Sequence, residues 1–396
     1  MGASVVNSPK ISGRRLLDDL DMLATFGGRE DGGVDRVAGS PADLASRVWL
    51  ADRITAAGLH AWTDEVGNVF GRQPGSRGPW LLTGSHTDTV PVGGRLDGAY
   101  GAIAAVEVLR TLHEAGHPAA AAVESVGFWD EEGVLPTSNG GLVGSGTLVE
   151  SGHIDEITGF IELHVEQGPR LENRRSTLAA VEGIVGIDRY LVVVRGQANH
   201  AGTTPMNVRA DAGRAVAKIA AHLWETANEV DESMVVNVGA MQLYPGAPNV
   251  VPGEAHLTVE FRAESELSLL RAVERTRALV RRIGAEQGCS VEVSQLSHKP
   301  VVRFEDGYVD RIHEVCVRHD PTATRLMSYA GHDASALSAR VPTGMIFVPS
   351  TAGISHSPVE QTPKEDLILG AQVLLDLLVE LESSRSRALP VHSEAR

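Results

Sequence analysis

Residues 79–88 read Pro-Trp-Leu-Leu-Thr-Gly-Ser-His-Thr-Asp. The mostly apolar start, Pro79 to Gly84, predicts a strand that is buried on both faces. This strand runs directly into His86 and Asp88, whose side chains lie on the same side of an extended segment. We therefore expect a buried strand that delivers polar, potentially metal-binding groups at its carboxyl end.

The same pattern recurs twice further along the chain. Ala120 to Trp129 predicts a second buried strand, and Phe160 to His164 predicts a third. A helix is expected between the first two strands, over Gly101 to Ala115. Strands that alternate with helices favour a mixed, mainly parallel α/β sheet flanked by helices. In such sheets ligands collect at the carboxyl ends of the strands, so we expect the polar motifs to meet there.

Two helices and a short strand are expected before this stretch. The spacing of apolar residues predicts helices over Arg14 to Phe26 and over Ala42 to Ala57. Asp64 to Gly71 predicts a short strand. Residues 1–13 and the Ser/Arg-rich tail after Glu382 are expected to lack regular structure.

The pattern changes after about Val181. The expected elements there are strands over Gly186 to Arg195, Met234 to Ala240, Ala255 to Ala263 and Ser290 to Gln295, and helices over Arg209 to Ala227 and Leu267 to Gly284. Their β-α-β-β-α-β order is that of the ferredoxin-like split motif. The expected domains are therefore residues 1–182 and 298–396, which form the catalytic part, and an inserted domain over residues 183–297.

Composition supports two domains and narrows the partners. The chain has 396 residues, 42% of them hydrophobic, and a net charge of −16. A single core stops growing at roughly 250–300 residues, and a negative net charge disfavours nucleic acid or an anionic membrane as a partner. Cys289 and Cys316 are too few for a disulfide framework and favour a reducing compartment. With no membrane-span-like run and no signal-peptide pattern, the expected location is the cytoplasm.

His86, Asp88 and Asp97 form the first candidate group. His86 would bind a metal ion, and Asp88 would hydrogen-bond its other ring nitrogen and so fix the tautomer. Asp97 stands in an Asp-Gly pair before a helix, where an aspartate commonly makes a turn or an N-cap. Its closeness to His86 favours instead a carboxylate whose two oxygens bridge two ions.

Three acids, Asp130, Glu131 and Glu132, follow the second buried strand. A charged strand exit is the plain alternative, but a buried strand seldom ends in three acids unless a cation is near. We assign Glu132 as a metal ligand. Glu131 is assigned as the general base, which takes a proton from water and gives it to the leaving nitrogen.

His164 and His356 supply the remaining imidazoles. A lone histidine is more often structural than a ligand, and the chain has 15 of them. Together, however, these two would complete two coordination spheres. Imidazole and carboxylate ligands suit zinc or manganese and also accept cobalt or nickel. Two such ions held close together can activate water at neutral pH.

With these motifs in this order, the chain resembles the M20 metallopeptidase-type amidohydrolases, in the branch of N-carbamoyl-L-amino-acid amidohydrolases, allantoate amidohydrolases and β-ureidopropionases. The matching stretches are Gly-Ser-His-Thr-Asp-Thr-Val (84–90), Gly-Gly-Arg-Leu-Asp-Gly (93–98), Asp-Glu-Glu-Gly (130–133), Glu-Leu-His-Val-Glu-Gln-Gly (162–168), Gly-Gln-Ala-Asn-His-Ala-Gly-Thr-Thr-Pro-Met (196–206), Pro-Asn-Val-Val-Pro (248–252), Gly-His-Asp-Ala (331–334) and residues 345–360. They span nearly the whole chain. His164 stands where related peptidases place an acid, which points to the amidohydrolase branch.

The resemblance implies a di-metal exopeptidase-like catalytic fold with an inserted ferredoxin-like lid and dimerisation domain. Two divalent ions per subunit are implied, with Glu131 as the acid/base. The ligand sets share Asp97: they are His86, Asp97 and His164 for one ion, and Asp97, Glu132 and His356 for the other.

The resemblance also implies substrate contacts from the lid in a homodimer. His200 would stabilise the oxyanion at the partner subunit's metal centre. Asn249 and Arg262 would bind the substrate carboxylate, since a guanidinium makes a bidentate pair with it, and Gln167 and His332 would lie beside the substrate. From the residues alone, Arg262 could also be an exposed strand-end arginine. His200 and Asn249 could likewise be turn residues.

One segment departs from the family pattern. Family members commonly carry Arg-Phe after Glu-Glu-Gly, whereas residues 134–141 here read Val-Leu-Pro-Thr-Ser-Asn-Gly-Gly. This difference bears on the substrate pocket and not on the metal chemistry. The expected reaction is hydrolysis of a carbon–nitrogen bond in a linear ureido or amide compound that bears a carboxylate. The first expected substrate class is the N-carbamoyl-L-amino acids, the second is allantoate or ureidoglycolate, and the third is acylated amino acids or dipeptides. A metal-loaded protein without catalysis comes last, because no expected ligand or base is missing.

Overall fold

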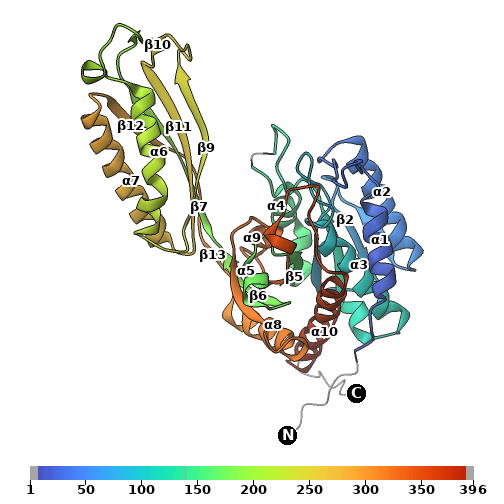
Figure 1. Cartoon of the computed structure of the whole chain (residues 1–396). Coiled ribbons are helices and arrows are strands. Elements are labelled where there is room, and N and C mark those ends of the chain that lie inside the picture. The colour runs from blue at the N-terminus through green and yellow to red at the C-terminus, as the bar shows by residue number, and fades with distance from the viewer. Residues whose placement is uncertain (1–7, 139, 389–396) are drawn as a thin grey trace. The chain divides into compact units, whose positions relative to one another are not determined.

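A computed structural model describes residues 8–138 and 140–388 of the chain (Figure 1). The chain divides into two compact units, one of residues 1–183 with 303–396 and the other of residues 184–302. The second unit is thus an insertion in the sequence of the first. Among the described residues, no helix is both long enough and apolar enough to cross a membrane.

The first unit is built on a nine-stranded sheet whose order is β1-β2-β4-β3-β5-β15-β6-β13, with β14 paired to β6. Its strands are β1 (His60–Thr63), β2 (Val69–Arg72), β3 (Trp80–His86), β4 (Val123–Phe128), β5 (Ile157–Val165), β6 (Ala179–Ile184), β13 (Val302–Arg303), β14 (Thr324–Ser328) and β15 (Thr343–Val348). The central strands β4, β3, β5 and β15 are parallel. β2 pairs antiparallel with β4, and β6 pairs antiparallel with β15. The predicted mixed, mainly parallel sheet flanked by helices is confirmed.

The helices of the first unit pack on the strands of this sheet or on neighbouring helices and turns. They are α1 (Gly13–Leu23), α2 (Pro41–Ala56), α3 (Ala99–Glu114), α4 (Val143–Glu150), α5 (Arg170–Arg174), α8 (Asp306–His319), α9 (Asp333–Leu337) and α10 (Lys364–Ala388), with short 3-10 turns at Pro118–Ala122, Gly152–Glu156 and Thr351–Gly353. α3 packs on β3, β4 and β5, and α10 packs on β15 and on α3. Local sequence places the helix ends: Ser40 caps α2 through the Asp43 N–H, and Pro41 occupies the first turn.

The second unit has the predicted β-α-β-β-α-β order. Its elements are β7 (Gly186–Arg195), β8 (Asn199–His200), a 3-10 turn (Met206–Val208), α6 (Ala212–Asn228), β9 (Val235–Tyr244), β10 (Val250–Val251), β11 (Glu254–Ala263), α7 (Glu266–Glu286) and β12 (Ser290–Lys299). The four long strands form an antiparallel sheet in the order β12-β7-β11-β9. Burial alternates along β11, because every second side chain packs into the core that α6 and α7 share with the sheet.

Several predicted boundaries are wrong. The strand expected over 64–71 begins only at Val69, because the Asp64 carboxylate accepts the backbone N–H groups of Val66, Gly67 and Asn68 and holds them in a turn. Strand β1 was not predicted. β12 continues to Lys299 rather than ending at Gln295, and this unit ends at Val302.

The expected lack of regular structure holds for residues 8–12, which lie outside any helix or strand, and is wrong for residues 383–388. α10 continues to Ala388, so residues 383–388 are helical. The Ser12 N–H donates to the buried Glu107 carboxylate, and the Ile11 N–H donates to Gln372, which fixes the residues before α1. Residues 1–7 and 389–396 lie outside the described residues.

Candidate metal centre

The expected ligands meet at the carboxyl ends of the parallel strands. His86 is the last residue of β3, His164 is the penultimate residue of β5, and Glu131 and Glu132 follow β4. Asp97 precedes α3, and His356 lies in the loop between β15 and α10. Parallel strands deliver these residues to one edge of the sheet, which is the place expected for a ligand.

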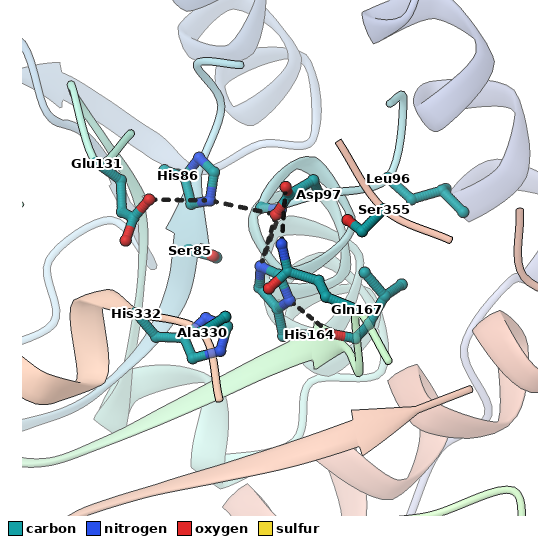
Figure 2. Close-up of polar contacts among 12 residues, drawn as sticks. Ser85, His86, Leu96, Asp97, Glu131, His164, Gln167, Ala330, His332 and Ser355 are labelled. Atoms are coloured by element: carbon teal, nitrogen blue, oxygen red, sulfur yellow. Dashed lines mark hydrogen bonds and ion pairs between the residues drawn. The ribbon is translucent and has the colours of Figure 1, made fainter. Parts of the chain in front are cut away.

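Asp97 belongs to two groups of donor side chains, and Figure 2 shows it beside His86 and His164 of the first group. Its Oδ1 lies 3.2 Å from His164 Nε2 and 3.7 Å from His86 Nε2. Its Oδ2 lies 2.9 Å from His356 Nε2, and His356 Nε2 lies 3.5 Å from Glu132 Oε1. Each oxygen of the one carboxylate therefore faces a different set of donors, which is the arrangement that a ligand shared by two ions requires.

The two buried histidines present their Nε2 atoms to this carboxylate. His86 Nδ1 lies 3.0 Å from the backbone carbonyl of Asp88, and His164 Nδ1 lies 2.8 Å from that of Val165. A carbonyl can only accept, so each Nδ1 carries a proton, and in the neutral form of each ring the lone pair is on Nε2. That is the tautomer in which an imidazole can bind a metal ion through Nε2.

Asp88 does not make the side-chain contact that the sequence led us to expect. Its carboxylate oxygen lies 3.6 Å from His86 Nδ1, too far for a good hydrogen bond, and its backbone carbonyl takes that role. The two carboxylate oxygens instead accept the backbone N–H groups of Glu131 and Glu132, each at 3.2 Å. Asp88 therefore positions the peptide that carries both glutamates.

Glu131 and Glu132 are held differently. The Glu131 carboxylate lies 3.7 Å from His86 Nε2, and its side chain is 10% exposed. Burial raises the pKa of Glu131 well above its usual range, as does the charge of Glu132 nearby. Burial, followed by the charge of Asp97, raises the pKa of Glu132 to about 7. A carboxyl whose pKa is raised in this way suits proton transfer near neutral pH.

The surrounding carboxylates raise the pKa values of the histidines as well, which favours their protonated forms. Burial alone would lower the pKa of His86, but Asp88, Glu131 and Asp97 raise it well above its usual value. The hydrogen bond to Asp97 raises the pKa of His356 to about 9. These shifts record a dense set of carboxylates at the strand ends, and divalent cations would favour the ionised forms of the acids.

The residues fit two metal ions. His86, Asp97 and His164 form one group, and Asp97, Glu132 and His356 form another, each with its donor atoms within 4.8 Å of one another. Glu132 Oε1 is buried and makes no hydrogen bond. Buried carboxylate oxygens rarely lack a partner, and a cation would supply one. Mixed nitrogen and oxygen donors suit zinc or manganese.

Gln167 and His332 lie against this centre (Figure 2). Gln167 has a left-handed backbone, with φ of 60°, and its side-chain amide donates to Asp97 Oδ2 at 2.9 Å. The His332 ring is buried against that of His164, with centroids 4.5 Å apart, and its Nε2 bonds to Ser328 Oγ. Burial, together with the neighbouring His164, lowers the pKa of His332 well below its usual value. His332 is therefore neutral beside the centre.

His200 and Asn249 belong to the second unit and lie together there. β8 pairs with β10, so that His200 faces Val250, and the Asn249 carbonyl accepts the Ala201 N–H at 2.9 Å. His200 is exposed, and its Nδ1 accepts two backbone N–H groups, from Gly202 at 3.0 Å and Thr203 at 3.2 Å. The proton of the neutral ring therefore sits on Nε2, which can donate to a ligand.

Arg262 lies far from that pair within the same unit. It stands near one end of β11, opposite Ile187, whereas Glu254 at the other end lies opposite Arg195. At ~3.3 Å per residue, the two ends are roughly 26 Å apart. The β8–β10 ribbon adjoins the Glu254 end, because the Gly196 N–H donates to the Gly253 carbonyl. Arg262 Nε donates to Glu260 at 2.7 Å.

Two buried glutamates that we did not assign also contact the site. Glu162 accepts hydrogen bonds from Ser85 Oγ at 2.7 Å and from the Ala334 N–H at 2.9 Å. Glu360 accepts the N–H groups of Leu96 and Asp97. Their spacing from the predicted ligands could have indicated these residues from the sequence. Glu162 lies two residues before His164 on a strand, and Glu360 lies four residues after His356.

The segment that departs from the family pattern folds onto the backbone of Glu131. The Leu142 N–H donates to the Glu131 carbonyl, and Ser138 Oγ donates to the Asp130 carboxylate. Gly141 has a φ of +93°, and a Cβ there would lie 2.1 Å from the Glu131 carbonyl oxygen. The glycine in this segment thus permits a close approach that a side chain would block.

A mainly parallel α/β sheet whose strand ends present two donor groups with one shared carboxylate has the arrangement expected of a two-metal hydrolase. Within that class, the model of Peptidase family M20/M25/M40 matches residues 82–380, and the chain belongs to this family. The resemblance drawn from the motifs is confirmed.

Named relatives narrow the chemistry. The allantoate amidohydrolase of Bacillus subtilis (strain 168) is 31% identical over 399 residues, which cover 92% of this chain and 97% of that protein. The N-carbamoyl-L-amino-acid amidohydrolase of Paenarthrobacter aurescens is 31% identical over 408 residues, covering 94% and 99%. A hydantoinase/carbamoylase family amidase from Burkholderia ambifaria has a similar structure, with a TM-score of 0.85, 30% identity, and 94% and 98% of the two chains covered. The chain is a hydrolase that acts on carbon–nitrogen bonds other than peptide bonds.

Proposed function

We propose that this protein is a two-metal amidohydrolase that cleaves a carbon–nitrogen bond in a linear ureido or carbamoyl compound bearing a carboxylate. The first candidate reaction converts an N-carbamoyl-L-amino acid and water to the amino acid, carbon dioxide and ammonia. The observation that carries the proposal is Asp97, whose two carboxylate oxygens face two separate donor groups beside Glu131. Zinc or manganese is the proposed ion, and cobalt or nickel would fit the same donors.

Glu131 is the proposed proton carrier. Bound divalent ions would supply a Lewis acid for the scissile carbonyl and lower the pKa of water. The Glu131 carboxylate lies beside His86, and burial raises its pKa, so it can accept a proton from water and deliver it to the leaving nitrogen. The Asp88 carboxylate orients Glu131 by accepting the Glu131 backbone N–H.

His200 is the proposed donor to the carbonyl oxygen. The two backbone N–H groups that bond Nδ1 fix the proton on the exposed Nε2. A donor fixed before reaction stabilises negative charge that grows on the oxygen without further reorganisation. Arg262 and Asn249 are the proposed ligands of the substrate carboxylate, with Gln167 and His332 on the side of the metal centre.

A homodimer would explain how both sets of lid residues reach one substrate. His200 and Asn249 lie at one end of β11 and Arg262 at the other, a distance several times the length of a carbamoyl amino acid. One copy of this unit therefore cannot place both on the same small molecule. Two copies can, if each lends one set to the site of the other.

β9 is the proposed contact between the copies. It is one of the two edge strands of its sheet, and its exposed side chains include Val235, Val238, Met241 and Leu243. An unpaired edge with apolar side chains readily pairs with another strand.

Allantoate is the second candidate substrate. The observation in its favour is that the Bacillus subtilis allantoate amidohydrolase is as similar to this chain, at 31%, as the carbamoylase of Paenarthrobacter aurescens. Both compounds carry a ureido group close to a carboxylate, so the metal centre alone does not choose between them.

The test is ammonia release by manganese-loaded protein from N-carbamoyl-L-amino acids, allantoate, ureidopropionate, N-acetyl amino acids and dipeptides, with amine detection for the last two. We expect release from one ureido class. In Glu131→Gln, kcat should fall by about 10²–10⁴-fold, the usual contribution of a general base, while two metal ions per chain remain bound. Glu150→Gln, at an exposed helix position, is the matched control. Wild-type turnover in Glu131→Gln would refute the base assignment, and cleavage of only acyl or peptide bonds would refute the ureido assignment.

A further inference from the structure

Glu360 joins two segments of the metal centre. Its Oε2 accepts the backbone N–H groups of Leu96 at 2.8 Å and Asp97 at 3.1 Å. Its Oε1 accepts Ser355 Oγ at 2.7 Å. One carboxylate, only 2% exposed, thus holds the peptide of the shared ligand Asp97 and the residue next to His356. Leu96, Asp97 and Ser355 lie on adjacent segments in Figure 2.

The chain makes room for this carboxylate at Gly94. A Cβ on residue 94 would lie 2.0 Å from Glu360 Oε2 and 2.3 Å from its carboxyl carbon. Residues 94–97 therefore wrap around the Glu360 carboxylate, and only glycine at this position permits the wrap. The backbone of residues 94–97 therefore has the conformation that these hydrogen bonds to Glu360 require.

The two donor groups differ in how they are supported. His86 and His164 lie on the central strands β3 and β5, and their side chains are 2% and 1% exposed. His356 lies in a loop, has a left-handed φ of 51°, and its side chain is 48% exposed. The first group is thus positioned by the sheet, whereas the second needs another support.

The loop of His356 is held by backbone hydrogen bonds within the loop and by the Ala352 N–H, which donates to Glu172 at 3.0 Å. Its base is closed by the Thr351 N–H, which donates to the Gln361 carbonyl at 2.8 Å, and the Glu360 N–H donates to Ser357 at 3.0 Å. The bond from Ser355 to Glu360 connects this loop to the peptide of Asp97. Without it, the relative position of His356 and Asp97 would depend mainly on their own side-chain contact, at 2.9 Å.

We propose that Glu360 is a positioning residue that holds His356 in register with Asp97 and so selectively tightens the second metal site, formed by Asp97, Glu132 and His356. Two of the three ligands of the first site, His86 and His164, are held by the sheet, so this site depends less on Glu360. The inference rests on the two-metal site proposed above and is independent of the substrate.

The test is a titration of metal-free protein with Co²⁺, followed by visible absorption, with the metal content then measured by mass spectrometry after dialysis. Wild type should bind two ions. Glu360→Ala should keep the first affinity and lose about 10–100-fold in the second, the usual effect of removing a group that orients a metal ligand. Ser355→Ala, which cuts only the link to the His356 loop, should weaken the second step by at least ~3-fold. Gly94→Ala should push the carboxylate away and resemble Glu360→Ala.

Glu360→Gln should rescue the second site. Its amide oxygen can accept both backbone N–H groups, and its amide nitrogen can donate to Ser355 Oγ, so all three contacts remain hydrogen-bonded without the charge, the one to Ser355 in the reverse direction. We expect both Co²⁺ affinities within about 3-fold of wild type. A loss as large as that in Glu360→Ala would show that the charge acts rather than the link, and would overturn the proposal.

Asp320 offers a matched control. It is also a buried carboxylate of the first unit that ties two segments, through the N–H groups of Thr177 and Thr322, both at 2.8 Å. Asp320→Ala should lower the unfolding temperature yet leave both Co²⁺ steps unchanged. A loss of the second ion in Asp320→Ala as well would attribute the effect to general destabilisation and overturn the proposal.

The remaining outcomes are decisive. Equal loss of both ions in Glu360→Ala, or two ions bound at wild-type affinity, would overturn this inference alone. Fewer than two ions in wild type would overturn the proposed two-metal site and this inference with it. If Glu360→Ala does not fold, Ser355→Ala and Gly94→Ala decide: wild-type affinities in both would overturn the inference.

Discussion

Asp97 shows most directly how residue-level alternatives were resolved. An aspartate before a helix commonly caps it, but α3 begins after Gly98 and makes no side-chain cap hydrogen bond. The carboxylate turns instead toward His86, His164 and His356. Because buried carboxylates are costly without partners, this orientation is stable only beside cationic groups or metal ions.

Metal affinity should rise with pH. The hydrogen bond to Asp97 raises the pKa of His356 to about 9, so below that pH a metal ion must displace a proton. Burial raises the pKa of Glu132 to about 7, which adds a second proton at lower pH. We expect the second metal affinity to rise by up to about 10-fold per pH unit from pH 6.5 and to level off near 9, as measured by chelator competition.

The metal-free protein should show the opposite trend. A histidine whose pKa is raised on folding contributes stability that is complete below its unfolded value, ~6.5, and is lost as pH rises through about 9. Chemical unfolding of metal-free wild type and His356→Ala over that range would show this difference. A second-site metal affinity that does not change with pH would contradict the proton displacement.

At the scale of elements, strand ends supply several of the ligands, and loops with strained backbone conformations orient side chains at the site. Three residues at the edge of the site, Asp130, Gln167 and His356, have left-handed backbones without being glycine, with φ of 54°, 60° and 51°. Such conformations cost about 1–3 kcal/mol each and cluster at functional sites. The glycine-rich loop after Glu131 belongs to the same set of supports.

Gly141→Ala should impair catalysis more than metal binding. The added Cβ would meet the Glu131 carbonyl oxygen at 2.1 Å, and φ of +93° disfavours a side chain. We expect Glu131 to shift, kcat to fall by at least about 10-fold and stability to fall by about 1–2 kcal/mol, with two metal ions still bound. Steady-state kinetics, chemical unfolding and metal analysis would measure the three effects.

Gly146 provides the control for this substitution. It lies within α4 and a Cβ there would meet nothing within 4 Å. Alanine in a helix is about 0.5–1 kcal/mol more favourable than glycine, so Gly146→Ala should be neutral or stabilising. Equal kinetic effects in the two variants would exclude a specific contact between residue 141 and Glu131.

At the scale of the whole molecule, the metal donors belong to the first unit, and His200, Asn249 and Arg262 belong to the second. Because β11 separates Arg262 from the other two, the proposed substrate site would take residues from two copies of the second unit. Under this proposal, activity depends on dimer formation.

Mixing two inactive variants should restore activity. In His200→Ala each site lacks the carbonyl donor, and in Arg262→Ala each lacks the carboxylate ligand. If these residues come from different copies, a mixed dimer has one intact site, so random exchange should restore about a quarter of wild-type activity. Ammonia release after joint refolding would measure this recovery.

Met241→Lys, on the exposed face of β9, should prevent dimer formation and abolish the recovery. Light scattering would show whether the dimer is lost. No recovery between stable dimers would contradict the shared site.

The periodicity and motifs were sufficient for the parallel core, the ferredoxin-like insert and the candidate ligands. Buried strands read as apolar runs, and their carboxyl ends must share one edge of a parallel sheet, so the ligands could be grouped without coordinates. One boundary was misplaced because a side chain sets it: the Asp64 carboxylate turns the start of a predicted strand into a loop.

Only the tertiary structure decided how the site is supported. Asp88 binds backbone N–H groups rather than His86, and Glu360 joins Asp97 to Ser355 across more than 250 residues of sequence. The structure also placed Arg262 at the opposite end of β11 from His200 and Asn249. Residue type and local periodicity determine which groups face the core, but such contacts depend on loop paths and strand register, which join residues that no local pattern relates.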